Sequence, residues 1–209
     1  SYLALGPSNV YLTFASEVAG GVVMGSKSIS PPSCIACLEG TPEEIATNST
    51  SVYWTDRLMG ELRYTALGGG DVMTYWTGAV GVPIAVGEDF ICWFSQSANA
   101  VHCGDSHGTI RFMVSVPGEV NSMATNGDVL AIFASSSLFL IDAVSGSTLN
   151  ISPGESSERA LAMDATHVYW AEGEPGFEES VWRMELTSFT SEELAREAAT
   201  ALALDATYV

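Results

Sequence analysis

The segment Ile45-Ala46-Thr47, followed after a short polar turn by Val52-Tyr53-Trp54, decides the fold because its pattern recurs along the whole chain. Each copy has an apolar residue, an alanine, a third apolar residue or threonine, a turn, and then an apolar or aromatic run. The copies start at residues 3, 45, 84, 123, 161 and 202 of the 209-residue chain. Their regular spacing of roughly 40 residues predicts an architecture built from internal repeats.

Each repeat contains four short apolar segments separated by turns. In the second repeat these segments lie at residues 45–47, 52–56, 61–67 and 72–77, and glycine, asparagine, aspartate and serine dominate the turns between them. Short strands bounded by such turns are typical of all-β proteins. Four strands repeated about every 40 residues favour the blades of a β-propeller over a pair of β-sandwich domains, which need no fixed period.

The number of repeats sets the expected domain organisation. The sequence holds five complete blades and the start of another, and it ends within the second strand of that sixth copy. Propellers have roughly four to eight blades. We therefore expect residues 1–209 to form one propeller domain that is incomplete at its C-terminus, as a fragment of a ring with six to eight blades.

The composition of the chain excludes some classes of partner. Acidic residues outnumber basic ones by 25 to 7, which gives a formal net charge of −18. Such a surface repels nucleic acid and anionic membranes. We expect no membrane span within the chain, because no stretch reaches the roughly 18 apolar residues that a span needs. No stretch resembles a signal peptide, and we expect any targeting signal to lie outside this sequence.

Four cysteines are candidates for structural disulfides. A turn centred between Ser97 and Ala98 places Cys92 directly opposite Cys103 in a hairpin, at a separation that a disulfide can bridge. Cys34 and Cys37 form a second candidate pair, in a long insertion of the first repeat. Free thiols, or a metal or redox role, are the alternatives for both pairs. Two disulfides would favour an oxidising compartment outside the cytoplasm.

Candidate catalytic and metal-binding residues are sparse. The segment His102-Cys103-Gly104-Asp105-Ser106-His107 contains metal-ligand types, but His102 and Cys103 should point to opposite faces of their strand. The segment Gly68-Gly69-Gly70-Asp71 lacks the lysine and the helix of a phosphate-binding loop. We therefore assign no catalytic, metal-binding or cofactor-binding residues and expect no cofactor.

The residues Tyr53-Trp54-Thr55-Asp56 spell the motif of the YWTD propeller repeats found in lipoprotein-receptor ectodomains, and Tyr169-Trp170-Ala171-Glu172 is a degenerate copy. The stretches 161–170 and 202–209 also resemble the repeats of secreted or lipid-anchored bacterial propellers of the myxobacterial type. This resemblance covers essentially the whole chain as a repeat. It implies an extracytoplasmic protein in which Tyr53, Trp54, Tyr169 and Trp170 pack the blades and have no catalytic role.

These features lead to one functional expectation and two alternatives. We expect a non-catalytic extracytoplasmic scaffold that binds a protein, peptide or glycan on one face. The first alternative is a propeller enzyme, a hydrolase, lactonase or lyase, with its site at the central channel. It would require acidic or histidine side chains from several blades to converge, whereas the innermost strands offer mainly Ala, Leu, Ile and Met. A purely structural spacer is the second alternative.

Overall fold

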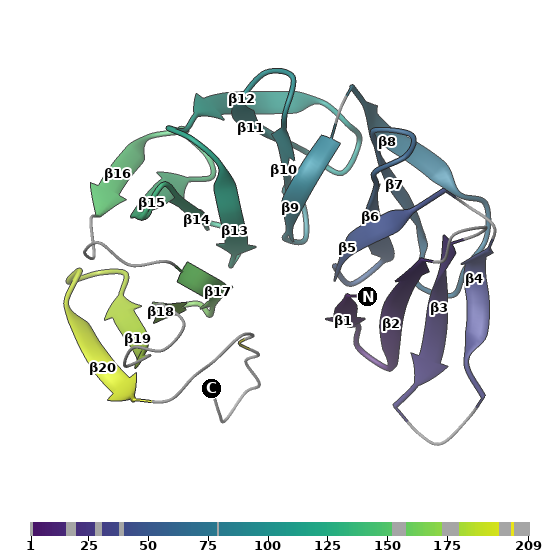
Figure 1. Ribbon diagram of the computed structural model, residues 1–209, viewed down its shortest axis with the longest axis horizontal. Helices are drawn as coiled ribbons and strands as arrows, with labels where there is room; N and C mark the ends of the chain where they lie inside the picture. The colour runs from purple at the N-terminus through teal and green to yellow at the C-terminus, as the bar shows by residue number, and fades with distance from the viewer. Residues whose placement is uncertain are drawn as a thin grey trace. The chain divides into compact units, whose positions relative to one another are not determined.

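The structure is a computed structural model that describes residues 2–15, 20–27, 31–37, 40–78, 80–151, 158–172 and 180–196, together with Leu202. Twenty strands form five four-stranded antiparallel sheets, and the described residues contain no helix (Figure 1). In every sheet the strands are ordered as they follow one another in sequence. Each sheet corresponds to one predicted repeat, which confirms the predicted all-β blades. The repeat expected from residue 202 onward lies outside the described residues apart from Leu202.

The chain divides into two compact units, Ser1–Ser115 and Val116–Val209. The first unit holds three blades. Blade 1 comprises β1 (Leu3–Leu5), β2 (Asn9–Ala15), β3 (Gly20–Ser26) and β4 (Ser33–Cys37). Blade 2 comprises β5 (Pro42–Thr47), β6 (Ser51–Asp56), β7 (Glu61–Ala66) and β8 (Met73–Thr77). Blade 3 comprises β9 (Val80–Val86), β10 (Ile91–Ser95), β11 (Ala100–Gly104) and β12 (Ile110–Ser115).

The second unit holds two blades. Blade 4 comprises β13 (Val120–Thr125), β14 (Val129–Ala134), β15 (Ser137–Asp142) and β16 (Thr148–Ile151). Blade 5 comprises β17 (Glu158–Met163), β18 (His167–Glu172), β19 (Ser180–Glu185) and β20 (Ser191–Ala195). Within each unit the first strand of one blade contacts the first strand of the next, so β1, β5 and β9 form one series and β13 and β17 another.

The strand-two aromatic pair of blade 2 fills two different joints between blades. Successive residues of a strand point to opposite faces. Trp54 therefore packs into the apolar cluster shared with blade 1, and Tyr53 into the cluster shared with blade 3. In the second unit Trp170 packs into the cluster shared with blade 4. Two of the recurring alanines lie at these joints, Ala4 between blades 1 and 2 and Ala46 between blades 2 and 3. A small side chain there lets neighbouring first strands approach closely.

A recurring turn residue ties adjacent blades through the backbone. The side-chain oxygen of Asn48 accepts a hydrogen bond from the Ser51 amide at 2.8 Å, and its Nδ2 donates to the Glu88 carbonyl of blade 3 at 3.2 Å. Asn126 holds the same repeat position in blade 4, and its Nδ2 donates to the Asp164 carbonyl of blade 5 at 3.1 Å. One asparagine thus closes its own turn and satisfies a carbonyl of the next blade, so each tie fixes the spacing of two inner strands.

Candidate functional site

The first strand of blade 2 carries a β-bulge at Glu43 and Glu44. The pairing of β5 with β6 shifts between Pro42 and Ile45, so these two glutamates oppose Thr55 alone. A bulge breaks the alternation of a strand and re-aims its side chains. The two glutamates therefore do not continue the in-and-out pattern that begins at Ile45, and both are half-buried.

The threonine of the repeat motif fixes this part of the strand. The Thr55 hydroxyl oxygen accepts a hydrogen bond from the Glu44 amide at 3.2 Å. Thr13 occupies the same repeat position in blade 1, and its hydroxyl oxygen accepts from the Tyr2 amide at 2.9 Å. Both threonines are buried. The same contact thus positions Glu44 in blade 2 and Tyr2 in blade 1, each immediately before the first apolar residue of its repeat.

Blade 3 has a larger irregularity at the same place. Val80 pairs with Ser95 and Ile84 with Trp93, so residues 81–83 oppose a single residue of β10. Gly81 lies close to Gln96, because a Cβ atom added to this glycine would lie 2.9 Å from the Cγ atom of the Gln96 side chain. Gln96 therefore lies directly over the backbone of the irregular segment.

The starts of the first strands of blades 1, 2 and 3 line one pocket of about 470 Å³, which we call the bulge pocket. Its walls include Tyr2 from blade 1, Glu43 and Arg57 from blade 2, and Gly81, Val82 and Gln96 from blade 3. Its volume lies within the range of roughly 300–1,000 Å³ that is usual for ligand sites. The pocket lies entirely within the first unit.

The aspartate of the motif positions the turn that carries Arg57. One carboxylate oxygen of Asp56 accepts hydrogen bonds from the backbone amides of Leu58 and Met59, at 3.1 and 3.2 Å, and from that of Thr41 at 3.2 Å. The Arg57 amide in turn donates to the Thr41 carbonyl at 3.1 Å. Asp56 is fully buried, so the β6–β7 turn is anchored below the pocket while the Arg57 side chain remains 77% exposed.

Glu43 and Arg57 are the charged residues that line the bulge pocket, and Glu44 lies next to Glu43 in the bulge. Burial raises the pKa of Glu44 to about 7; the hydrogen bond from the Ile84 amide, at 3.1 Å, opposes this shift and the charge of Glu43 adds to it. Burial also raises the pKa of Tyr2, with further contributions from Glu44 and then Glu43. Glu43 accepts a hydrogen bond from the Arg57 guanidinium at 3.2 Å.

The cysteines lie in two pairs at disulfide-bonding distance. Cys92 and Cys103 are directly opposed in β10 and β11, with Cα atoms 4.2 Å apart, the register expected from the hairpin. The Cα atoms of Cys34 and Cys37 lie 5.8 Å apart in β4. Two covalent links of this kind would constrain blades 1 and 3.

We expect reduction to destabilise the protein mainly through the Cys92–Cys103 pair. Closing a loop of this length stabilises a fold by about 2–3 kcal/mol, and the shorter Cys34–Cys37 loop contributes less. Urea unfolding with and without reductant measures the effect. The double substitution Cys92→Ala/Cys103→Ala should abolish most of the response to reductant, whereas Cys34→Ala/Cys37→Ala should preserve most of it. A wild-type protein that does not respond to reductant would show that the thiols are not paired.

His102 is enclosed between blades 2 and 3. Its ring centroid lies 5.6 Å from that of Trp93 and 5.7 Å from that of Trp76. Only 7% of the residue is exposed, and neither ring nitrogen has a hydrogen-bond partner. Burial lowers the pKa of His102. Within the described ranges, no three His, Cys, Asp or Glu side chains gather so as to hold a metal ion.

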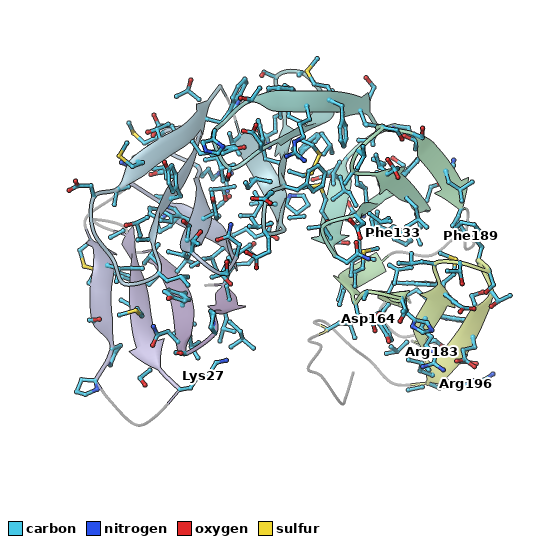
Figure 2. All side chains as sticks on the ribbon, turned by 180° about the vertical axis from the view of Figure 1, so that it is seen from behind. Lys27, Phe133, Asp164, Arg183, Phe189 and Arg196 are labelled. Carbon is cyan, nitrogen blue, oxygen red and sulfur yellow. A yellow bond between two sulfur atoms is a disulfide. The ribbon has the colours of Figure 1, made fainter. Side chains whose placement is uncertain are left out.

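Blade 5 carries a second, more polar pocket of about 400 Å³ on β18, β19 and β20. His167, Arg183, Glu185 and Glu192 line it, and Arg183 pairs with Glu192 across the two outer strands (Figure 2). Asp164 lies in the turn before β18. Burial opposes ionisation of Asp164, but hydrogen bonds from backbone amides and from the Tyr169 hydroxyl lower its pKa to about 2. The Tyr169 ring of the degenerate motif is thereby fixed by a carboxylate.

The sequence pattern indicated the aromatic motif but not the bulge pocket. In the structure Tyr53, Trp54, Tyr169 and Trp170 are all buried, and Thr55 and Asp56 position the polar residues around the pocket. Glu43 and Glu44 were missed because they precede the first apolar residue of the repeat. The signal that points to them is the threonine shared by Thr13 and Thr55, which holds the preceding residues of the first strand in both blades.

The comparisons with solved structures place the chain among β-propellers. A chain of the nidogen–laminin complex matches with a TM-score of 0.71 and 17% identity over 93% of this chain and 78% of its own length. The WD40 domain of Toxoplasma gondii coronin matches with a TM-score of 0.69 and 11% identity, over 94% of this chain and 59% of its own. A puromycin-hydrolysing peptidase of Mycobacterium tuberculosis matches with a TM-score of 0.68 and 16% identity, over 94% and 38%.

The chain is therefore a β-propeller of four-stranded blades, and at these identities the likeness shows the fold alone. It spans less than two thirds of the coronin and peptidase chains that it matches. No family model matches the sequence, and no curated protein matches it either. None of the described residues form a helix that is long and apolar enough to cross a membrane.

Proposed function

We propose that this propeller is a non-catalytic binding module that works outside the cytoplasm and recognises a protein, peptide or glycan at the bulge pocket. The observation that carries the proposal is the convergence of three blades on one pocket. Tyr2, Glu43 and Gly81 lie at the starts of the first strands of consecutive blades; Thr13 holds the amide of Tyr2, and Thr55 holds the amide of Glu44 next to Glu43. A pocket built on a rigid scaffold in this way is pre-organised, which lowers the cost of binding.

The exposed side chains of the pocket support recognition of a partner. Tyr2 is 46% exposed, and tyrosine is among the residues that contribute most binding energy at protein interfaces. Gln96 is exposed beside it and offers both a donor and an acceptor. The two cysteine pairs at bonding distance support a location outside the cytoplasm, because disulfides persist in oxidising compartments.

Capture experiments with the full chain test this function. Immobilised protein would be exposed to the extracytoplasmic fraction of its source cells and to a glycan array. We expect Tyr2→Ala to weaken capture of the recovered partner by about tenfold or more, since loss of a central aromatic anchor costs about 2 kcal/mol. Phe189→Ala is the matched control, because Phe189 is a similarly exposed aromatic residue on blade 5 (Figure 2). Failure to recover any partner, or equal capture by Tyr2→Ala, would contradict the proposal.

A further inference from the structure

The bulge pocket places a carboxylate beside an exposed aromatic ring. Glu43 contributes a partly exposed carboxylate, and Tyr2 lies close enough for the charges of Glu43 and Glu44 to act on its phenol. We propose that this pocket receives the cationic end of an arginine or lysine side chain of a partner protein. This inference rests on the proposed binding function and names the chemistry of the partner.

The protein's own Arg57 shows how a guanidinium fits against this carboxylate. Arg57 Nη1 lies 3.2 Å from the Glu43 carboxylate oxygen, although the arginine side chain is 77% exposed. An ion pair this exposed is weak, so displacing it costs little. Arg57 therefore acts as a replaceable occupant: it satisfies Glu43 in the free protein and can swing into solvent when a partner's cation arrives.

The other residues that line the bulge pocket fit the aliphatic part of an arginine or lysine side chain. Val80 and Val82 supply apolar contact for the methylene groups of arginine or lysine, which pack readily against apolar surface. The aromatic ring of Tyr2 can make a cation–π contact with the charged end of the side chain. The volume of about 470 Å³ exceeds what a lone ion needs and accommodates a side chain with its neighbouring backbone.

The charge of the whole chain favours the same partner. A formal net charge of −18 attracts basic proteins over long range and accelerates their encounter. This attraction is unspecific, because the acidic residues are scattered. The bulge pocket adds specificity by offering one carboxylate next to an aromatic ring at a defined position. Binding at the pocket should therefore depend on Glu43 more than on any other single exposed carboxylate.

Glu44 should make the affinity for a cation depend on pH. Besides burial, the groups that act on its carboxyl are the Ile84 amide of β9 and Glu43 on the same strand, which in turn holds Arg57; the charge of Glu44 itself acts on the Tyr2 phenol from blade 1. Because burial and Glu43 raise the pKa of Glu44 to about 7, the carboxyl is partly protonated near neutral pH. A cation arriving nearby favours the ionised form, so the proton passes to the buffer. Affinity should therefore rise as the pH increases through 7.

Calorimetry with short peptides on the full chain tests the inference. The probes are acetyl-Gly-Arg-Gly-amide and the same peptide with citrulline, which keeps the shape of arginine without its charge. At pH 8 and low salt we expect the arginine peptide to bind at least about tenfold more tightly. Glu43→Gln should remove most of that preference. Asp71→Asn is the matched control, because it changes the net charge equally at an exposed residue that does not line the pocket.

Two further variants separate a specific effect from general damage. Arg57→Ala should tighten binding of the arginine peptide by up to about fivefold, since it removes the competing guanidinium. Glu44→Gln should retain binding but abolish the proton release, which is measured by repeating the titration in buffers of different ionisation enthalpy. Equal binding of both peptides, or equal losses in Glu43→Gln and Asp71→Asn, would overturn the inference.

The outcome also distinguishes this inference from the proposed function. If a partner is captured and Tyr2→Ala releases it, but Glu43→Gln does not weaken its binding, the protein is a binding module whose pocket does not select cations. If the arginine peptide binds as expected, but no partner depends on Tyr2, the pocket selects cations and the proposed recognition of a macromolecule is wrong.

Discussion

Replacing Trp54 with alanine is expected to lower the free energy of unfolding by about 3–5 kcal/mol, the cost of truncating a large buried aromatic side chain. Trp54 is fully buried in the joint between blades 1 and 2, where it packs near Ala4, Tyr11 and Val22 of blade 1. Its indole nitrogen has no hydrogen-bond partner. The loss is therefore one of packing alone, and a cavity would separate two blades. Urea unfolding followed by circular dichroism measures the change.

Two further variants, Trp54→Phe and Leu58→Ala, serve as references for Trp54→Ala. Trp54→Phe keeps an aromatic ring and sacrifices no hydrogen bond, so we expect it to cost well under half as much as Trp54→Ala. Leu58→Ala removes an apolar side chain that is 73% exposed, and it should change stability by no more than about 0.5 kcal/mol. A Trp54→Ala protein as stable as Leu58→Ala would mean that the joint between blades 1 and 2 does not stabilise the fold.

The blade pattern could be predicted from the sequence because it depends on local periods. The alternation of Tyr53 and Trp54 and the count of residues between Cys92 and Cys103 each follow from the geometry of one strand or one hairpin. The fourth strand of blade 5, β20, forms at the expected place in the repeat although its segment Ser191–Ala195 is polar. These short patterns predict strands reliably because they recur, and a chance match in one copy would not appear in five.

The bulge pocket could not be predicted in this way, because a bulge is a departure from the period. From Ile45 onward the alternation is regular, but Glu43 and Glu44 share one partner on β6, which no count along a single strand reveals. The pocket also joins residues that are about 40 positions apart in three blades. Their meeting depends on how the blades pack. The sequence predicted mainly apolar residues in the innermost strands. In the structure, the innermost strand of blade 2 also includes two glutamates at its start, Glu43 and Glu44.

The burial of His102 is a second feature that could not be predicted from the sequence. The sequence places it on a strand, on the face opposite Cys103, but its burial comes from Trp76, a residue of the neighbouring blade. Burial by another repeat leaves no trace in the local pattern. The consequence is physical, because burial beside two indole rings, without a hydrogen-bond partner, disfavours the charged form of the imidazole. The joint between blades 2 and 3 therefore contains two groups, His102 and Glu44, that resist ionisation.

These two groups should give the stability of the protein opposite dependences on pH. Glu44 has a pKa of about 7 in the folded protein against 4.5 for an ordinary glutamate, so the folded state binds the proton more tightly. Its contribution is fully present below pH 4.5 and is lost as the pH rises through 7. At about 1.4 kcal/mol per pKa unit, the loss amounts to about 3 kcal/mol. His102 has a pKa lowered from 6.5, so its penalty grows as the pH falls below 6.5.

Substitution separates the two contributions. Glu44→Gln keeps an oxygen that can accept the hydrogen bond from the Ile84 amide but cannot ionise, so above pH 7 this variant should be more stable than wild type by up to about 3 kcal/mol. Near pH 4.5 the advantage should vanish. His102→Leu should act in the opposite range: its advantage over wild type should grow below pH 6.5, because an apolar side chain has no charged form to bury beside Trp76 and Trp93.

Urea unfolding of the three proteins between pH 4.5 and pH 8.5 measures these differences, and tryptophan fluorescence reports directly on the rings beside His102. The difference between each variant and wild type isolates one group, because every other titration is shared. A Glu44→Gln advantage that is constant across the range would show that the carboxyl ionises in the folded protein as it does in the unfolded chain. A constant His102→Leu difference would show the same for the imidazole, and the joint between blades 2 and 3 would then have no dependence on either proton.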